Sequence, residues 1–199
     1  MSKFINVTAT ASDMFAPDTM VINCNLTLKG ESYEGLTNEY ANEHKLFVSE
    51  LKNLTKRTLK QRNYSVSVNK EYENNHYVDK GLVLRSDLEI ILPINYNLLN
   101  DIISLIGEHN AISVSVSYQL AKSEQFSKQL IAKAIKTARQ KADIIAEASG
   151  LVISDIANIT YQQGERAMAY AMRAVSNDVD FSAKEIRLSE SVVVEYEVI

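Results

Sequence analysis

Alternation of hydrophobic and polar residues runs through much of the chain and predicts strands. A period of two is typical of a strand that has one buried face. Five segments show this period in the first part of the chain, namely 4–11, 20–28, 64–72, 82–92 and 111–120. The same pattern predicts a short strand near 156–162 and a closing strand over 189–199.

Three other segments carry apolar residues at every third or fourth position, which is the helical period. The first runs from Glu34 to about Gln61, the second covers 95–110 and the third covers 126–150. Asn95 or Asn97 is suited to cap the start of the second helix, and Ser123 the start of the third. Gly150 is suited to the left-handed position that ends the third helix.

The order of the predicted elements indicates the fold class. From residue 18 to 120 this order is β-α-β-β-α-β. It matches the split βαβ arrangement, in which an antiparallel sheet carries two helices on one face. The third helix and the last two strands then either extend that sheet or build a second α+β layer. We therefore predict an α+β fold in a single domain over 1–199, with sub-layers 1–120 and 121–199.

The third helix is rich in alanine and has a narrow apolar stripe. Ala134, Ala138 and Ala142 form the centre of the stripe, with isoleucines towards both ends. A nucleic-acid helix would need a cationic face with interleaved aromatic residues. A membrane-surface helix or a coiled coil would need bulky apolar residues instead. The stripe favours close packing on the protein's own sheet, with a partner helix as the remaining alternative.

Composition narrows the class of protein. Hydrophobic residues make up 46% of the 199 residues and charged residues 23%, which is ordinary for a globular protein. The formal net charge of −4 argues against a nucleic-acid or anionic-membrane partner. No stretch of about 18 residues is apolar enough to span a membrane, and the N-terminus lacks the pattern of a secretory signal. We expect a cytoplasmic protein, or a periplasmic or secreted one if a signal peptide has been removed.

Residues that carry chemistry are scattered along the chain. His44, His76 and His109 lie far apart and do not have the spacing of metal ligands. Cys24 stands at an inward position of an alternating strand, which is typical of a core residue. Neither a nucleophile elbow nor a phosphate-binding glycine loop occurs in the sequence. We therefore predict no catalytic, cofactor-binding or metal-binding residues, and a protein that is not an enzyme.

A basic cluster lies where the first long helix is predicted to end. Its members are Lys52, Lys56, Arg57, Lys60 and Arg62. Cations at the C-terminal end of a helix complement the helix dipole, which accounts for them without any ligand. A patch that binds an anion or a partner is the functional alternative.

The connection 164–182 is long and lies between two strands that we expect to pair. A connection of this length inside a compact domain is usually functional or mobile. Methionine, tyrosine and arginine favour protein interfaces. This segment contains Arg166, Met168, Tyr170, Met172 and Arg173, which form a candidate interface. A flexible hairpin tip is an equally weighted interpretation.

Several segments, taken in order, resemble the SIMPL-domain family, a domain of unknown function. INVTATASDMFAPDTMVINCNLT (5–27) is similar to the family's first two strands and the proline-aspartate turn between them, here Pro17 and Asp18. AIKTARQKADIIAEASGLVISDIANITY (134–161) resembles the family's alanine-rich helix, glycine and short strand. Three further strands of the family are matched by LRSDLEIIL (84–92), AISVSVSYQL (111–120) and SVVVEYEV (191–198).

The resemblance implies an α+β fold and self-assembly, in some members into large rings. It implies no established catalytic residue. Bacterial members are linked to the envelope and to oxidative-stress defence, and animal members to signalling through protein contacts. This chain departs from the family in having Ala9 and Ala11 where glycines are usual. We also expect it to differ from many bacterial members in having no signal peptide.

These observations lead to one functional expectation and one alternative. We expect a non-enzymatic, self-associating structural or interaction protein that forms a homo-oligomer and has a stress-related role. The alternative is a small-ligand or anion-binding module that uses the basic cluster between residues 52 and 62.

Overall fold

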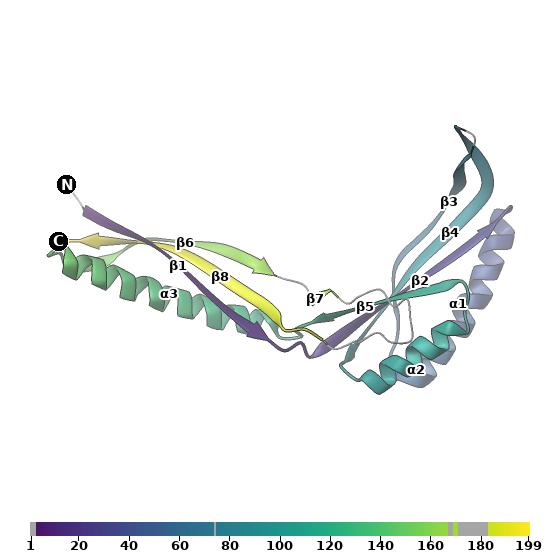
Figure 1. Ribbon diagram of the computed structural model, residues 1–199, viewed down its shortest axis with the longest axis horizontal. Helices are drawn as coiled ribbons and strands as arrows, with labels where there is room; N and C mark the ends of the chain where they lie inside the picture. The colour runs from purple at the N-terminus through teal and green to yellow at the C-terminus, as the bar shows by residue number, and fades with distance from the viewer. Residues whose placement is uncertain (1–2, 74, 167–168, 171–182) are drawn as a thin grey trace. The chain divides into compact units, whose positions relative to one another are not determined.

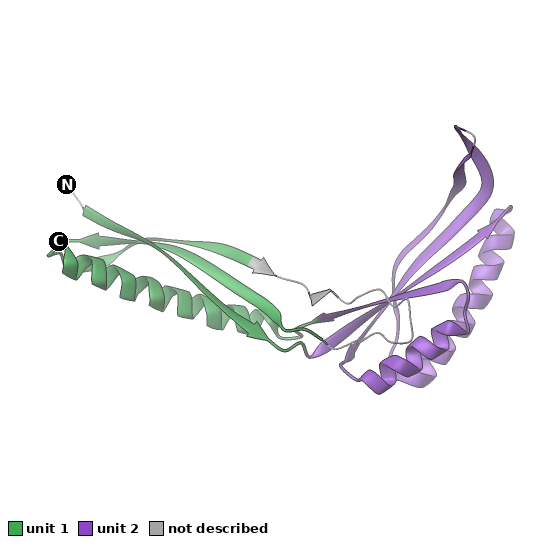
Figure 2. Ribbon diagram, viewed as in Figure 1, with its two compact units in different colours: residues 1–17, 119–169, 183–199 green, residues 18–118, 170–182 purple. Residues whose placement is uncertain are grey.

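The structure is a computed structural model, and it describes residues 3–199 apart from 74, 167–168 and 171–182. The chain divides into two compact units (Figure 2). Unit 1 contains residues 1–17, 119–169 and 183–199, and unit 2 contains residues 18–118 and 170–182.

Unit 2 has the predicted β-α-β-β-α-β order. Its elements are β2 (Thr19–Gly30), α1 (Tyr33–Thr55), β3 (Lys60–Glu73), β4 (His76–Pro93), α2 (Tyr96–Gly107) and β5 (Ile112–Gln119). The strand order is β3-β4-β2-β5-β7, where β7 is Ala169–Tyr170. β4 runs antiparallel to both β2 and β3, so β2 and β3 are parallel and joined by a crossover through α1. The α+β prediction and the order of elements over 18–120 are confirmed.

The core of unit 2 lies between one face of its sheet and the two helices. The inward residues of β2 are those that the alternation selects, and Met20, Ile22, Cys24 and Leu26 are fully buried. α1 contacts both β2 and α2, which places the two helices on the same face. The helices contribute Leu36, Phe47 and Leu51 from α1, and Leu99, Ile102 and Ile106 from α2.

Side-chain caps set where the two helices of unit 2 begin. The Ser32 hydroxyl accepts a hydrogen bond from the backbone N–H of Gly35 at 3.1 Å before α1. The side-chain oxygen of Asn95 accepts one from the N–H of Leu98 at 3.1 Å before α2. Each cap satisfies a backbone donor that a helix start leaves unpaired. The prediction of an asparagine cap for α2 is confirmed at Asn95.

The end of α1 differs from the prediction. Lys56 adopts a left-handed conformation with a φ of 54°, and its backbone N–H bonds to the carbonyl of Lys52 at 2.9 Å. This geometry ends the helix at Thr55. The predicted extension to Gln61 is therefore wrong, because β3 already begins at Lys60.

Unit 1 brings together segments from both ends of the chain. β1 (Lys3–Phe15), β8 (Ile186–Val198) and β6 (Ile153–Arg166) form a three-stranded sheet in the order β1-β8-β6. The central strand β8 pairs antiparallel with both neighbours. α3 (Ser123–Ala148) lies along one face of this sheet (Figure 1). The third helix and last two strands thus build a second α+β layer, and they share it with the first strand.

α3 packs on this sheet through its alanines. Ala134, Ala138 and Ala142 are 0% exposed and belong to one buried cluster with the inward residues of β1 and β8. The interpretation of this helix as a packing helix is confirmed. Its first residue is Ser123 itself, preceded by Lys122, so the predicted cap at Ser123 is wrong. Gly150, with a φ of 67°, takes the predicted left-handed position after the helix.

Candidate interaction surface

A single helix is too narrow to cover the sheet of unit 1. Neighbouring strands lie about 4.8 Å apart, and a helix with its side chains is roughly 10 Å wide. α3 accordingly packs along β1 and β8 and contacts β6 much less. Among the described residues of unit 1, no element therefore covers the part of β6 that faces the α3 side of the sheet.

The uncovered part of β6 is apolar. Ile156, Ile159 and Tyr161 are 44%, 45% and 47% exposed, and we call these three residues the β6 strip. Residues that lie directly opposite in an antiparallel pair share one face of the sheet. The partners of the strip on β8 are Tyr196, Val194 and Val192, which are at most 1% exposed. The strip therefore continues the buried face of the sheet out to its edge.

A buried carboxylate holds one end of the β6 strip. Glu190 of β8 is only 2% exposed. It accepts hydrogen bonds from the Tyr161 hydroxyl at 2.6 Å and from the backbone N–H of Gly164 at 3.4 Å. A side chain at Gly164 would place its Cβ 1.8 Å from the carbonyl oxygen of Ser189. Glycine is thus required for β6 to approach β8 this closely.

Charged residues of α3 lie near the buried aromatic partner of the strip. The Arg139 guanidinium stands 5.6 Å from the centre of the Tyr196 ring and donates to Asp143 at 2.9 Å. Tyr196 in turn pairs with Ile156 of the strip. The strip is therefore an apolar surface with a polar border, which is the usual anatomy of a protein interface.

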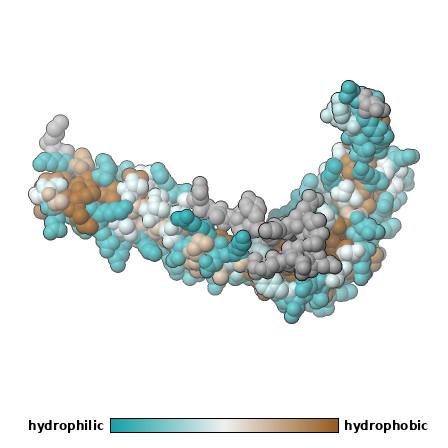
Figure 3. Space-filling model, viewed as in Figure 1, coloured by the Kyte–Doolittle hydropathy of each residue, from teal (hydrophilic) through white to brown (hydrophobic). Residues whose placement is uncertain are grey.

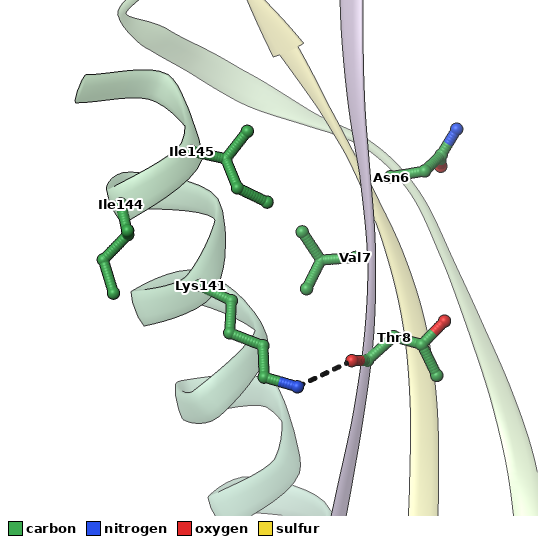
Figure 4. Close-up of a pocket in the computed structure, with 6 residues that line it drawn as sticks. All are labelled: Asn6, Val7, Thr8, Lys141, Ile144 and Ile145. Carbon is green, nitrogen blue, oxygen red and sulfur yellow. Dashed lines mark hydrogen bonds between the residues drawn. The ribbon is translucent and has the colours of Figure 1, made fainter. Parts of the chain in front are cut away.

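The opposite edge of the sheet has a second apolar feature. Val7 of β1 and Ile144 and Ile145 of α3 line a shallow hollow of about 380 Å³. Val7 and Ile145 point towards each other, and the Lys141 ammonium donates to the Thr8 carbonyl oxygen at 3.2 Å (Figure 4). Ile144 is 66% exposed and Ile145 is 43% exposed. Figure 3 shows hydrophobic surface gathered at the end of unit 1 where α3 ends and the two chain termini lie.

The predicted interface residues fall in two groups. Arg166 is the last residue of β6, and Tyr170 belongs to β7. Met168, Met172 and Arg173 lie outside the residues that the structure describes. The interface that the sequence predicts therefore begins at the end of β6. The role of these residues as an interface stays a prediction.

The structure distributes the basic cluster over two elements. Lys52 lies in the last turn of α1 and Lys56 follows the helix, with Arg57 next in the chain. Lys60 and Arg62 belong to β3, contrary to the expectation that all five residues lie at a helix end. Arg62 forms an ion pair with Glu89 of β4. Its charge therefore has a partner within the protein.

His109 connects the segment after α2 to α1. Its Nε2 lies 2.9 Å from Glu50 and its Nδ1 lies 3.3 Å from Glu43. Burial disfavours the charged ring, but the hydrogen bonds to both carboxylates outweigh burial and raise the pKa of His109. Both ring nitrogens donate in the imidazolium form, so this form satisfies both carboxylates. The site joins elements of unit 2 and also borders a hollow of about 480 Å³ between α2 and β5.

The remaining residues that could carry chemistry are Cys24, His44 and His76. Cys24 is fully buried, and burial raises the pKa of its thiol to about 12. A thiol in this state is a poor nucleophile. His44 stacks near Tyr40 at a centroid distance of 5.1 Å, and burial lowers the pKa of its ring. His76 begins β4 and is exposed.

Among the residues that the structure describes, no three or more His, Cys, Asp or Glu side chains are grouped to hold a metal ion. In the same part of the chain, no helix has the length and apolar character needed to cross a membrane.

The protein has an α+β fold, and the β6 strip is an exposed apolar surface on its unit 1. Residues 5–196 match the model of SIMPL, described as a protein of unknown function (DUF541). The chain therefore belongs to the SIMPL family, as the resemblance of its segments suggested. No curated protein matches the chain.

The sequence pattern predicts a strand at β6 but does not predict which of its side chains share an exposed face. The signal was present, because Ile156, Ile159 and Tyr161 interrupt a polar segment with apolar side chains. The alternation is broken by register shifts between Ile153 and Asp155 and between Ile156 and Asn158. Each extra residue changes which face the next side chain occupies. The sequence alone therefore does not align these three residues on one face.

Proposed function

We propose that this chain is a self-associating interaction protein without catalytic activity, and that the β6 strip is a surface of association. The observation that carries the proposal is the continuation of a buried apolar face onto an edge strand that no described element covers. Edge strands with exposed apolar side chains are sites at which chains associate. The family resemblance, which implies self-assembly, supports the same conclusion.

The size of the β6 strip suits a contribution to a larger interface. Each of its side chains exposes nearly half of its surface. Burying that remainder contributes on the order of 1 kcal/mol per residue at about 25 cal/mol per Å². Three such residues do not make a stable interface alone, since stable interfaces bury roughly 1,200–2,000 Å². The strip therefore acts as the apolar centre of a wider contact, with polar residues of α3 at its rim.

The test is a charge placed in the middle of the strip. We expect Ile159→Lys to shift the protein towards the monomer mass of 22.3 kDa in light scattering after size exclusion. Thr160→Lys is the matched control, because Thr160 is exposed and its side chain lies on the other face of β6. Its partner on β8 is Val193. Association that is equally strong in both variants would argue against the strip, and a monomeric wild-type protein would contradict self-association itself.

The anion-binding alternative gains no observation in its favour. Arg62 is engaged by Glu89, and the remaining cations are distributed along the end of α1 and the start of β3. The cations near the helix end complement its dipole, as a ligand-free interpretation requires. We therefore advance self-association alone, and a stress-related role remains an expectation from the family.

A further inference from the structure

The two edges of the sheet in unit 1 differ in regularity. β6 has register shifts at three places in its pairing with β8. β1 pairs with β8 in unbroken register over its described length from Lys3 to Phe15. Bulges protect an edge strand from pairing with another chain, whereas a long regular edge is a template for it. The outer edge of β1 is therefore the better place for a further strand to add.

The hydrogen bond from Lys141 to the Thr8 carbonyl shows which backbone groups of β1 face outward. Along an antiparallel pair, residues alternate between those bonded to the neighbouring strand and those whose N–H and C=O point away from it. The Thr8 carbonyl accepts from Lys141 of α3, while the Ala9 carbonyl accepts from the side-chain hydroxyl of Ser191 on β8 at 3.4 Å. The outward set therefore contains Thr8 and the residues two positions away from it, Asn6 and Thr10.

The charges of β1 select one register for a second strand. Lys3 and Asp13 are the charged residues of this 13-residue strand, and they stand at equal distances from Thr8. Both have odd positions, on the same face as Ile5 and Val7, which are buried. In an antiparallel pair centred on Thr8, Lys3 of each copy faces Asp13 of the other. Shifting the register by two residues places each charge opposite an apolar residue or beyond the strand.

We propose that β1 pairs antiparallel with β1 of a second copy of this chain, about a two-fold axis beside Thr8. This inference rests on the proposed self-association and adds a second surface to it. In this register, the β1 backbone groups that point away from β8 in one copy lie opposite the same groups of the other copy. Antiparallel hydrogen bonding requires this alignment. It also places Ile5 opposite Ala11 and Val7 opposite Ala9 of the second copy, so apolar side chains meet on the α3 side.

The hollow beside β1 fits this arrangement. Val7, Ile144 and Ile145 line this hollow, and the exposed apolar surface of the two isoleucines is covered when the second copy arrives. Lys141 must release the Thr8 carbonyl first. An exposed lysine bond of this kind contributes little to stability, and a ladder of backbone bonds replaces it. The Lys141 side chain thus competes weakly with pairing at the outer edge of β1. We expect Lys141→Met to tighten the dimer roughly 3-fold or more.

A cysteine at the axis tests the register directly. Two Thr8 residues that form a hydrogen-bonded pair have Cα atoms about 5.5 Å apart, a separation that a disulfide spans. We expect Thr8→Cys to give a covalent dimer on a non-reducing gel after mild oxidation. Thr10→Cys is the control, because Thr10 lies opposite Asn6 of the second copy and the two Thr10 residues are roughly 13 Å or more apart. The native Cys24 is buried and does not add a background.

Charge exchange tests the same register without a covalent bond. Lys3→Asp sets carboxylates opposite each other and Asp13→Lys sets ammonium groups opposite each other. At low salt each single variant is expected to weaken dimerisation roughly 10-fold in sedimentation velocity. The double variant restores opposite charges and is expected to return to within roughly 3-fold of the wild type.

The outcomes separate this inference from the proposed function. A wild-type protein that stays monomeric overturns both. A wild-type protein that associates, but in which Thr10→Cys cross-links as well as Thr8→Cys or the double charge variant is as weak as the single ones, overturns only the β1 register. Efficient cross-linking at Thr8 together with rescue by the double variant supports it.

Discussion

At the scale of single residues, Gly164 has a role that its position near the end of β6 does not suggest. A Cβ atom there would stand 1.8 Å from the Ser189 carbonyl oxygen, which belongs to the backbone of the neighbouring strand. Backbone atoms in a paired strand cannot move aside as a flexible side chain can. Gly164 therefore fixes the close approach of β6 to Glu190 of β8, which the Tyr161 hydroxyl of β6 also contacts.

We expect Gly164→Ala to lower the free energy of unfolding by roughly 1–3 kcal/mol, because the added methyl group must push β6 away from β8. Urea denaturation followed by circular dichroism measures this change. Gly107→Ala is the control, since its Cβ would meet no described atom within 4 Å, and it is expected to be neutral or slightly stabilising. Equal effects of the two substitutions would show that the close approach is not required.

Single residues also show which features of the fold can be predicted from the sequence alone. The inward position of Cys24 follows from alternation, and Asn95 follows from the preference for a capping side chain. Glu190 is different, because it occupies an inward position of an alternating strand and its burial depends on Tyr161 and Gly164, which are far away in sequence. Partners that only the fold brings together are not visible in local patterns.

At the scale of elements, the helices and strands were largely predictable because each has one buried face. Alternation or helical period reports that face directly. Two features were not predictable: the early end of α1 at Thr55, and the pairing of β1 with β8. The first depends on the backbone conformation of a single lysine. The second joins segments at opposite ends of the chain, and nothing in a local pattern specifies a distant partner.

The contact of α1 with His109 gives a pH dependence at this scale. The pKa of His109 is raised in the folded protein, although burial alone would lower it, because Glu50 and Glu43 stabilise the charged ring. A raised folded pKa contributes stability that is fully present below the unfolded pKa of about 6.5. This stability is lost as the pH rises through the folded pKa. The Phe47 ring packs edge-on against the imidazole, with 5.3 Å between the two ring centroids.

We therefore expect the stability advantage of the wild type over His109→Gln to be largest in mildly acidic buffer and to shrink with rising pH. Thermal unfolding across the neutral range measures this difference. Glu50→Gln is the matched variant, because it removes the negative charge from the shorter of the two contacts and should flatten the pH dependence while the histidine is retained. An advantage that stays constant or grows as the pH rises would contradict this account.

At the scale of the whole molecule, the two units have separate sources of stability. The buried cluster around α3 is built from residues of unit 1, including Leu130. The buried residues of α1, including Leu51, belong to unit 2. The family match from residue 5 to 196 covers both units, so the division is a property of the structure within one family domain.

Matched truncations in the two units test their independence. Leu51→Ala and Leu130→Ala each remove a buried leucine from a helix and should cost roughly 2–5 kcal/mol. We expect calorimetry to show two unfolding transitions, with Leu51→Ala lowering one and Leu130→Ala lowering the other. A single transition that both variants lower to the same extent would show that the units unfold together.

The discontinuous make-up of unit 1 has a consequence for synthesis on the ribosome. β2 to β5 emerge as one continuous segment, and chains are made at about 5–20 residues per second with domains folding as they appear. β1 emerges before them, but its partner β8 spans Ile186–Val198. For several seconds the nascent chain therefore carries a strand whose apolar residues have neither β8 nor α3 to cover them. A chaperone that binds extended apolar segments would find its target in residues 3–15.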